Sequence, residues 1–134
     1  MRIFVDTSAF LAIIDGDDRF HPLALRFWEQ QLSGSAVLLT SNYVVLETTA
    51  LIQNRLGLEA VSVFHEEVLP VIYQEWINPD LHQKAVMALL AARRRDVSLV
   101  DYTSFVLMRH LGIRTAFTFD LHFAEQGFET LPLR

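Results

Sequence analysis

Short runs of β-branched and aromatic residues alternate along the chain with longer segments of helical periodicity. The short runs predict strands at residues 3–5, 36–39, 71–73 and 115–119, with a further short strand at 128–131. Apolar residues at helical spacing, together with capping residues, predict helices at 8–15, 22–32, 42–55, 58–68, 79–95 and 98–112. Strands separated by helices are typical of an α/β fold. We therefore predict one domain over residues 1–134, with a central, mostly parallel sheet of four to five short strands flanked by helices.

The composition is that of an ordinary folded domain, since 51% of the 134 residues are hydrophobic and 20% are charged. The absence of cysteine excludes disulfide frameworks, cysteine-ligated zinc and cysteine nucleophiles. No apolar run approaches the roughly 18 residues that a membrane span needs, and the run containing Val86–Ala92 is far too short. Asp6 follows the first apolar residues, where a signal peptide would continue, so we expect a cytoplasmic protein with no membrane association. The high hydrophobic content suggests that some apolar surface is covered by a protein partner or in a homodimer.

The formal net charge of −5 would by itself argue against a nucleic-acid partner, because phosphates repel an acidic surface. That argument fails if several acids are clustered to hold metal cations. The positions of the acidic residues therefore carry more information than their number.

Two predicted strands end in aspartate, at Asp6 and Asp120. In an open parallel sheet, ligands bind beyond the carboxyl ends of the strands, so these carboxylates would meet if their strands are neighbours. The alternative is that each aspartate caps the helix that follows it. The same position at the end of two strands favours a functional role.

Two further acids lie on predicted helices. Glu47 is the only charged residue between Ala36 and Asn54, and an isolated carboxylate on an apolar helix face is costly unless a cation or strong hydrogen bonds meet it. Asp101 follows Ser98 at the spacing of a capping box, which would explain it structurally. Tyr102, Thr103 and Ser104 place three hydroxyls on the same helix turn, which favours a functional role for Asp101.

Four carboxylates brought together would repel one another and resist ionisation. Mg²⁺ or Mn²⁺ removes the difficulty, because these cations prefer oxygen ligands and bind through a few carboxylates and substrate phosphates. Such ions orient a water molecule and stabilise a phosphoryl group under attack. Thr7 and Ser8, which follow Asp6, could position a metal-bound water or a phosphate oxygen, or could be ordinary first-turn residues.

Several segments of the sequence resemble the PIN-domain family. The opening Phe4-Val5-Asp6-Thr7-Ser8-Ala9-Phe10 is similar to the start of a PIN domain, and Leu99-Val100-Asp101-Tyr102-Thr103-Ser104-Phe105 to its later acidic helix start. Thr118-Phe119-Asp120, followed by His122-Phe123 and Gly127-Phe128, resembles its closing signature, and Glu47 lies where the family places its second acid. The size of the chain is most similar to that of VapC-type toxins of prokaryotic toxin–antitoxin pairs.

The resemblance implies a ribonuclease that hydrolyses RNA phosphodiesters and leaves 5′-phosphate and 3′-hydroxyl ends. Asp6, Glu47, Asp101 and Asp120 would be its catalytic, Mg²⁺- or Mn²⁺-binding acids. Ser104 stands where some members carry a further acid, so it is a candidate for positioning water or substrate. The resemblance also implies a homodimer inhibited by a small antitoxin protein. The alternatives are a non-cleaving RNA- or protein-binding module and another metal-dependent phosphoesterase.

Other residues have plainer interpretations. Trp28 and Trp76 could stack on bases, but their spacing places them in the predicted core. The run Arg93–Arg95 could contact RNA, yet a solvated helix C-terminus explains it as well, because three consecutive residues cannot share a helix face. The five histidines are scattered without metal-ligand spacing, which favours solvated or partly buried imidazoles over metal ligands.

Overall fold

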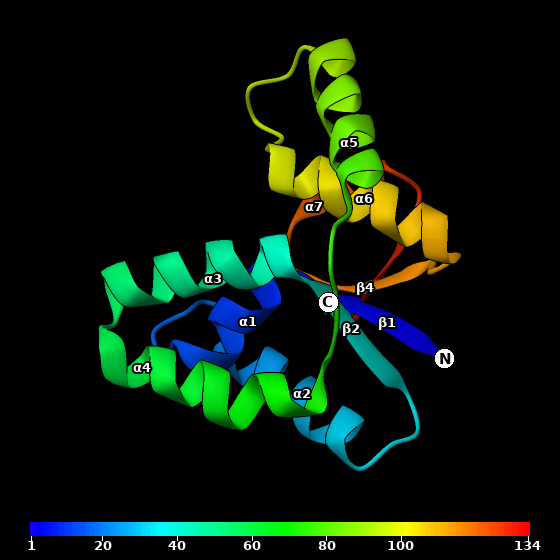
Figure 1. Cartoon of the computed structure of the whole chain (residues 1–134). Helices are drawn as coiled ribbons and strands as arrows, with labels where there is room; N and C mark the ends of the chain where they lie inside the picture. The colour runs from blue at the N-terminus through cyan, green and yellow to red at the C-terminus, as the bar shows by residue number, and fades with distance from the viewer.

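A five-stranded parallel sheet organises the computed structural model, which describes residues 1–134 (Figure 1). The strand order is β3-β2-β1-β4-β5, so the first strand is central and the chain crosses over on both sides of it. The strands are β1 (Arg2–Val5), β2 (Val37–Ser41), β3 (Tyr73–Glu75), β4 (Thr115–Phe117) and β5 (Glu129–Leu131). The predicted α/β class and parallel sheet are confirmed.

Seven α-helices connect and cover these strands. They are α1 (Thr7–Ile14), α2 (His21–Leu32), α3 (Asn42–Arg55), α4 (Leu58–Val63), α5 (Pro79–Ala92), α6 (Leu99–Leu111) and α7 (Leu121–Glu125). In Figure 1, α1 to α4 gather on one side of the sheet, and α5 to α7 lie on the other. None of these helices is both long and apolar enough to cross a membrane.

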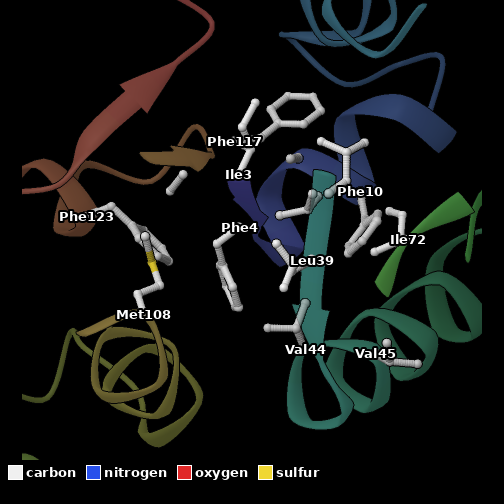
Figure 2. Close-up of a cluster of buried hydrophobic side chains, with 14 of the residues drawn as sticks. Ile3, Phe4, Phe10, Leu39, Val44, Val45, Ile72, Met108, Phe117 and Phe123 are labelled. Carbon is white, nitrogen blue, oxygen red and sulfur yellow. The ribbon is translucent and has the colours of Figure 1, made fainter. Parts of the chain in front are cut away.

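The core fills both faces of the sheet, because parallel strands covered by helices are apolar on each side. Phe4 of β1 packs toward α7, with 6.5 Å between its ring centroid and that of Phe123. Phe117 of β4 faces the opposite helices and contacts Phe27 of α2, with 4.6 Å between the centroids. Figure 2 shows this division, with Phe4 beside Met108 and Phe123, and Phe117 on the other side.

The chain between α3 and α5 departs from the predicted pattern. The single helix predicted at 58–68 is α4 continued by a π-helical turn over Phe64–Val68 and a 3-10 turn over Leu69–Val71. The irregular turns let Phe64 reach Phe10 of α1, with 5.0 Å between their centroids. The following strand therefore begins two residues later than predicted, at Tyr73.

Three other predictions need correction. Trp76 is 72% exposed and not part of the core, whereas Trp28 is buried as predicted. Leu32, one of the apolar residues at helical spacing from which the helix at 22–32 is predicted, is also exposed. The short helix α7 was missed, because its five residues are too few to show helical periodicity.

Candidate active site

Four helices begin at the carboxyl edge of the sheet or close beside it, and their caps position the candidate acids. Asp6 directly follows β1 and is the N-cap of α1, while Asp120 lies beyond β4 and is the N-cap of α7. Because β1 and β4 are neighbours in the sheet, both aspartates lie at one edge. Glu47 comes from the second turn of α3, and Asp101 from the first turn of α6. The structure thus satisfies the capping interpretation of the two aspartates and also brings them together.

Asp6 is the most buried of these carboxylates, at 4% exposure. Its Oδ2 accepts hydrogen bonds from the Ser8 hydroxyl (2.8 Å), the Ser8 backbone N–H (3.3 Å) and the Thr118 hydroxyl (3.0 Å). Burial raises the pKa of Asp6 to about 7, with further increases from the charges of Asp101 and Asp120, although the Ser8 and Thr118 hydrogen bonds oppose the shift. All three bonds converge on Oδ2, so Oδ1 is the oxygen available for another partner.

Glu47 is half-buried, and burial is the main cause that raises its pKa. The hydrogen bond from Thr7 lowers this pKa, whereas the charges of Asp101 and Asp120 raise it. Glu47 also lines a small cavity of about 220 Å³ together with Val100, the residue before Asp101. Because the charges of Asp101 and Asp120 act on Glu47, its half-buried carboxylate lies near these two acids.

Asp101 forms the predicted capping box with Ser98. The Ser98 N–H donates to Asp101 Oδ2 (3.0 Å), and the Asp101 N–H donates to the Ser98 hydroxyl (3.1 Å). Burial raises the pKa of Asp101, and the Asp120 charge adds to this, against the hydrogen bonds from Ser98. Mutual electrostatic influence therefore links all four acids.

The three candidate positioning hydroxyls have different surroundings. Ser8 accepts from the Phe119 N–H (2.9 Å) and donates to Asp6, so it ties α1 to the segment before Asp120. Thr7 accepts from the Thr48 hydroxyl (3.1 Å) and is directed toward Glu47. Ser104 is fully buried and donates within its own helix to the Val100 carbonyl (3.0 Å). Thr7 and Ser8 thus contact the acids, whereas the Ser104 hydroxyl is engaged by backbone.

Sequence reasoning missed Thr118 and His122. Thr118 is 1% exposed, donates to Asp6 and accepts from the Asp120 N–H (3.0 Å), so it connects two candidate acids. Its position between the end of β4 and Asp120 was the available signal. His122 Nδ1 lies 2.8 Å from Glu125 Oε1, and His122 Nε2 lies 3.9 Å from Asp120 Oδ1. Its position two residues after Asp120 was the available signal.

The donor set suits a hard divalent cation. All candidate ligands are carboxylate or hydroxyl oxygens, and no basic residue offsets the buried Asp6 carboxylate. No three acidic or histidine side chains lie close enough to form a ready-made metal cage. A divalent cation is therefore favoured by the chemistry of the oxygen donors and not by a preformed cage.

Comparison with known proteins decides the family. The PIN domain model matches residues 3–129, nearly the whole chain. The chain belongs to the PIN-domain family. Over 127 residues, this PIN domain is 38% identical to the 23S rRNA-specific endonuclease VapC20 of Mycobacterium tuberculosis, covering 94% of this chain and 95% of VapC20. The predicted resemblance is therefore confirmed.

Solved structures agree with that assignment. The crystal structure of Mycobacterium tuberculosis VapC20, described as a sarcin–ricin loop cleaving toxin, matches this PIN domain with a TM-score of 0.84 and 37% sequence identity, covering 94% of this chain and 95% of that one. FitAcB from Neisseria gonorrhoeae matches with a TM-score of 0.65 at 12% identity, over 98% of this chain and 97% of that one. The second match shows that the same fold persists when little sequence is shared.

Proposed function

We propose that this PIN-domain protein is a divalent-metal-dependent endoribonuclease and the toxin of a toxin–antitoxin pair. The observation that carries the chemistry is the buried Asp6 carboxylate, which pairs with no basic residue and whose pKa is raised by burial and by two neighbouring acids. Similarity to VapC20 along 94% of the chain supports RNA as the substrate. By the same similarity, the RNA is 23S rRNA, cleaved in the sarcin–ricin loop.

Asp6, Glu47, Asp101 and Asp120 would hold Mg²⁺ or Mn²⁺. When bound, such a cation lowers the pKa of a coordinated water and neutralises charge on the phosphate under attack. The protein's contribution is rigid placement of oxygen ligands: Ser8 and Thr118 fix Asp6, and the Ser98 capping box fixes Asp101. Asp120 is held by the His122 N–H (2.9 Å), and Thr7 fixes Glu47.

The remaining hydroxyls take subordinate roles in this proposal. Ser8 and Thr7 position the carboxylates, through which they orient water and substrate. Ser104 supports the first turns of α6 from inside, because its hydroxyl bonds to Val100, next to Asp101. A small antitoxin, a homodimer and a cytoplasmic location complete the proposal. Exposed apolar side chains such as Leu46 and Trp76, both 72% exposed, fit protein partners.

The test is cleavage of purified ribosomal RNA and of a labelled sarcin–ricin hairpin, with Mg²⁺, with Mn²⁺ or with chelator. We expect discrete fragments that disappear with chelator and with Asp101→Asn. Glu59→Gln, which changes an exposed acid of α4, is the matched control and should cleave like the wild type. Binding without cleavage by the folded protein would favour a non-cleaving module, and turnover of DNA or a small phosphate ester alone would favour another phosphoesterase.

A further inference from the structure

Two phenylalanines and two arginines form a layered cluster, Arg19, Phe20, Phe119 and Arg134, which we call the arginine–phenylalanine stack. The Phe20 and Phe119 rings are stacked, with 4.6 Å between centroids and 5° between planes. The Arg19 guanidinium lies 5.0 Å from the Phe20 centroid. The Arg134 guanidinium lies 4.9 Å from the Phe20 centroid and 5.5 Å from that of Phe119.

The stack lies directly beside the candidate acids. Phe119 immediately precedes Asp120, and its backbone N–H donates to the Ser8 hydroxyl, which in turn donates to Asp6. Phe20 stands at the N-cap of α2, while Phe27, seven residues on, reaches Phe117 lower on β4. Arg134 follows β5, whose last residue pairs with the end of β4. All four side chains therefore gather at the carboxyl edge of the sheet.

The two arginines of the stack are free to bind an anion. Both are exposed, and neither takes part in any ion pair of the structure. Arg94, by contrast, is occupied by Asp96 and Glu125. Other basic residues of the chain are also unpaired, so what matters is that Arg19 and Arg134 lie beside the acidic site, where an RNA phosphate must approach a chain with a net charge of −5.

Aromatic rings and guanidinium planes together are the usual platform for single-stranded RNA. Unpaired bases stack on aromatic side chains or on arginine planes, while the same guanidinium groups bind the phosphates between them. The cation–π contacts hold the Arg19 and Arg134 guanidinium groups close to the Phe20 ring, so these side chains lose less freedom when RNA binds.

We propose that the arginine–phenylalanine stack is an RNA subsite that holds a nucleotide flanking the cleaved phosphodiester. This inference rests on the proposed endoribonuclease function. It adds the residues that bind the unpaired loop of the RNA. Arg19 and Arg134 stack on a base and contact its phosphate, and Phe20 and Phe119 form the platform beneath them.

The test compares Arg19→Gln, Arg134→Gln and the double variant with Arg55→Gln. Arg55 is an exposed arginine in the last turn of α3, a helix that begins at the carboxyl edge and runs away from it, so it is the matched control. RNA affinity is measured by anisotropy of a labelled sarcin–ricin hairpin on an Asp101→Asn background with Mg²⁺. KM and kcat are measured with the active protein under steady-state conditions.

We expect the double variant to weaken RNA binding and raise KM roughly tenfold, with kcat within about a factor of two. The salt dependence of binding should become shallower by roughly 0.7 per lost phosphate contact. Arg19→Lys should keep the salt dependence and recover only part of the affinity, because an ammonium keeps the charge but loses the stacking plane. Arg55→Gln should match the parent protein.

Unchanged KM and RNA affinity in the folded double variant, with cleavage intact, would overturn the RNA subsite alone and leave the nuclease standing. A wild-type protein that neither binds nor cleaves RNA would overturn both proposals. An equal loss in Arg55→Gln would also overturn the subsite, because it would show a general charge effect and not a local one.

Discussion

Two clusters of carboxylates lie next to each other in this protein and behave in opposite ways. In the candidate active site, the pKa values of Asp6, Glu47 and Asp101 are raised, in each case chiefly by burial. In the Arg94 cluster, formed by Arg94, Asp96, His122 and Glu125, hydrogen bonds from the Arg94 guanidinium lower the pKa values of Asp96 and Glu125. His122 joins the two, since its Nε2 lies 3.9 Å from both Asp96 Oδ2 and Asp120 Oδ1.

The difference lies in whether the chain supplies its own cation. Arg94 donates to both oxygens of Asp96 (3.1 and 2.7 Å) and to Glu125 (2.9 Å), so its charge offsets part of the carboxylate charge and its hydrogen bonds tether α7 to the segment before α6. The active-site acids receive only hydroxyl and backbone donors, which stabilise a carboxylate without cancelling its charge. In the function we propose, the active-site acids bind an external cation, whereas the Arg94 cluster has a structural role.

The largest effect should come from removing one charge from the active-site cluster. Asp101→Asn keeps an oxygen that can accept from the Ser98 N–H but loses the carboxylate, so cleavage should fall about a hundredfold or more while the fold remains. Asp96→Asn makes the same chemical change in the Arg94 cluster and should cost far less activity. Single-turnover cleavage of both variants checks the contrast, and equal losses would contradict the division into two clusters.

The next effect is on stability against pH. The pKa of Asp6 is raised from 3.8 to about 7 on folding, so its favourable contribution is complete below about pH 4 and is lost as pH rises toward 7. Relative to Asp6→Asn, the metal-free wild type should lose up to about 4 kcal/mol of unfolding free energy across that range. Urea unfolding of both proteins between pH 4 and 8 measures the difference.

Metal should reverse that trend. Adding Mn²⁺ at pH 7 should stabilise the wild type, because a cation bound by the folded state favours the charged carboxylate, and should stabilise Asp6→Asn less. A wild-type stability that rises steadily from pH 4 to 7 in chelator, in parallel with Asp6→Asn, would refute the raised pKa of Asp6.

A smaller effect should follow from loosening Asp6 without removing it. Thr118→Val deletes the hydroxyl that donates to Asp6 Oδ2, so cleavage should fall roughly tenfold and the unfolding free energy by about 1–2 kcal/mol. The pKa of Asp6 should rise further, which moves the pH–rate profile to more alkaline values. Thr118→Ser restores a hydroxyl and should recover the profile; a purely packing role for Thr118 would leave the profile unmoved in both variants.

The smallest effect should come from opening the Arg94 cluster. Arg94→Gln removes an exposed ion pair, so cleavage at neutral pH should stay within about a factor of three of the wild type. Because the pKa values of Asp96 and Glu125 are lowered, what stability Arg94 adds is present at neutral pH and is lost as the solution is acidified through those lowered pKa values. Thermal melts of both proteins at pH 7 and pH 3 test this; a larger gap at pH 3 would contradict it.

Local signals in the sequence determined most of the secondary structure and the identities of the acids. Asp6, Ser41, Ser98 and Asp120 cap the helices that they precede, and Gly57 and Gly112 follow helices with φ values of 96° and 70°. These features depend on contacts within a few residues, so the sequence alone predicts them, except for the short helix after Asp120, which was missed. The isolation of Glu47 on an apolar helix was a local signal of the same kind.

The tertiary structure alone decided which residues meet. The strand order places β1 beside β4, and no local pattern in the sequence indicates this. As a result, Thr118 can donate a hydrogen bond to Asp6, which lies 112 positions earlier in the chain. Trp76 is exposed because no neighbouring element covers it. The contact between Phe64 and Phe10 likewise depends on how their elements pack together. Local energetics fix each element, but the raised pKa of Asp6 exists only because the fold buries that carboxylate and places two more beside it.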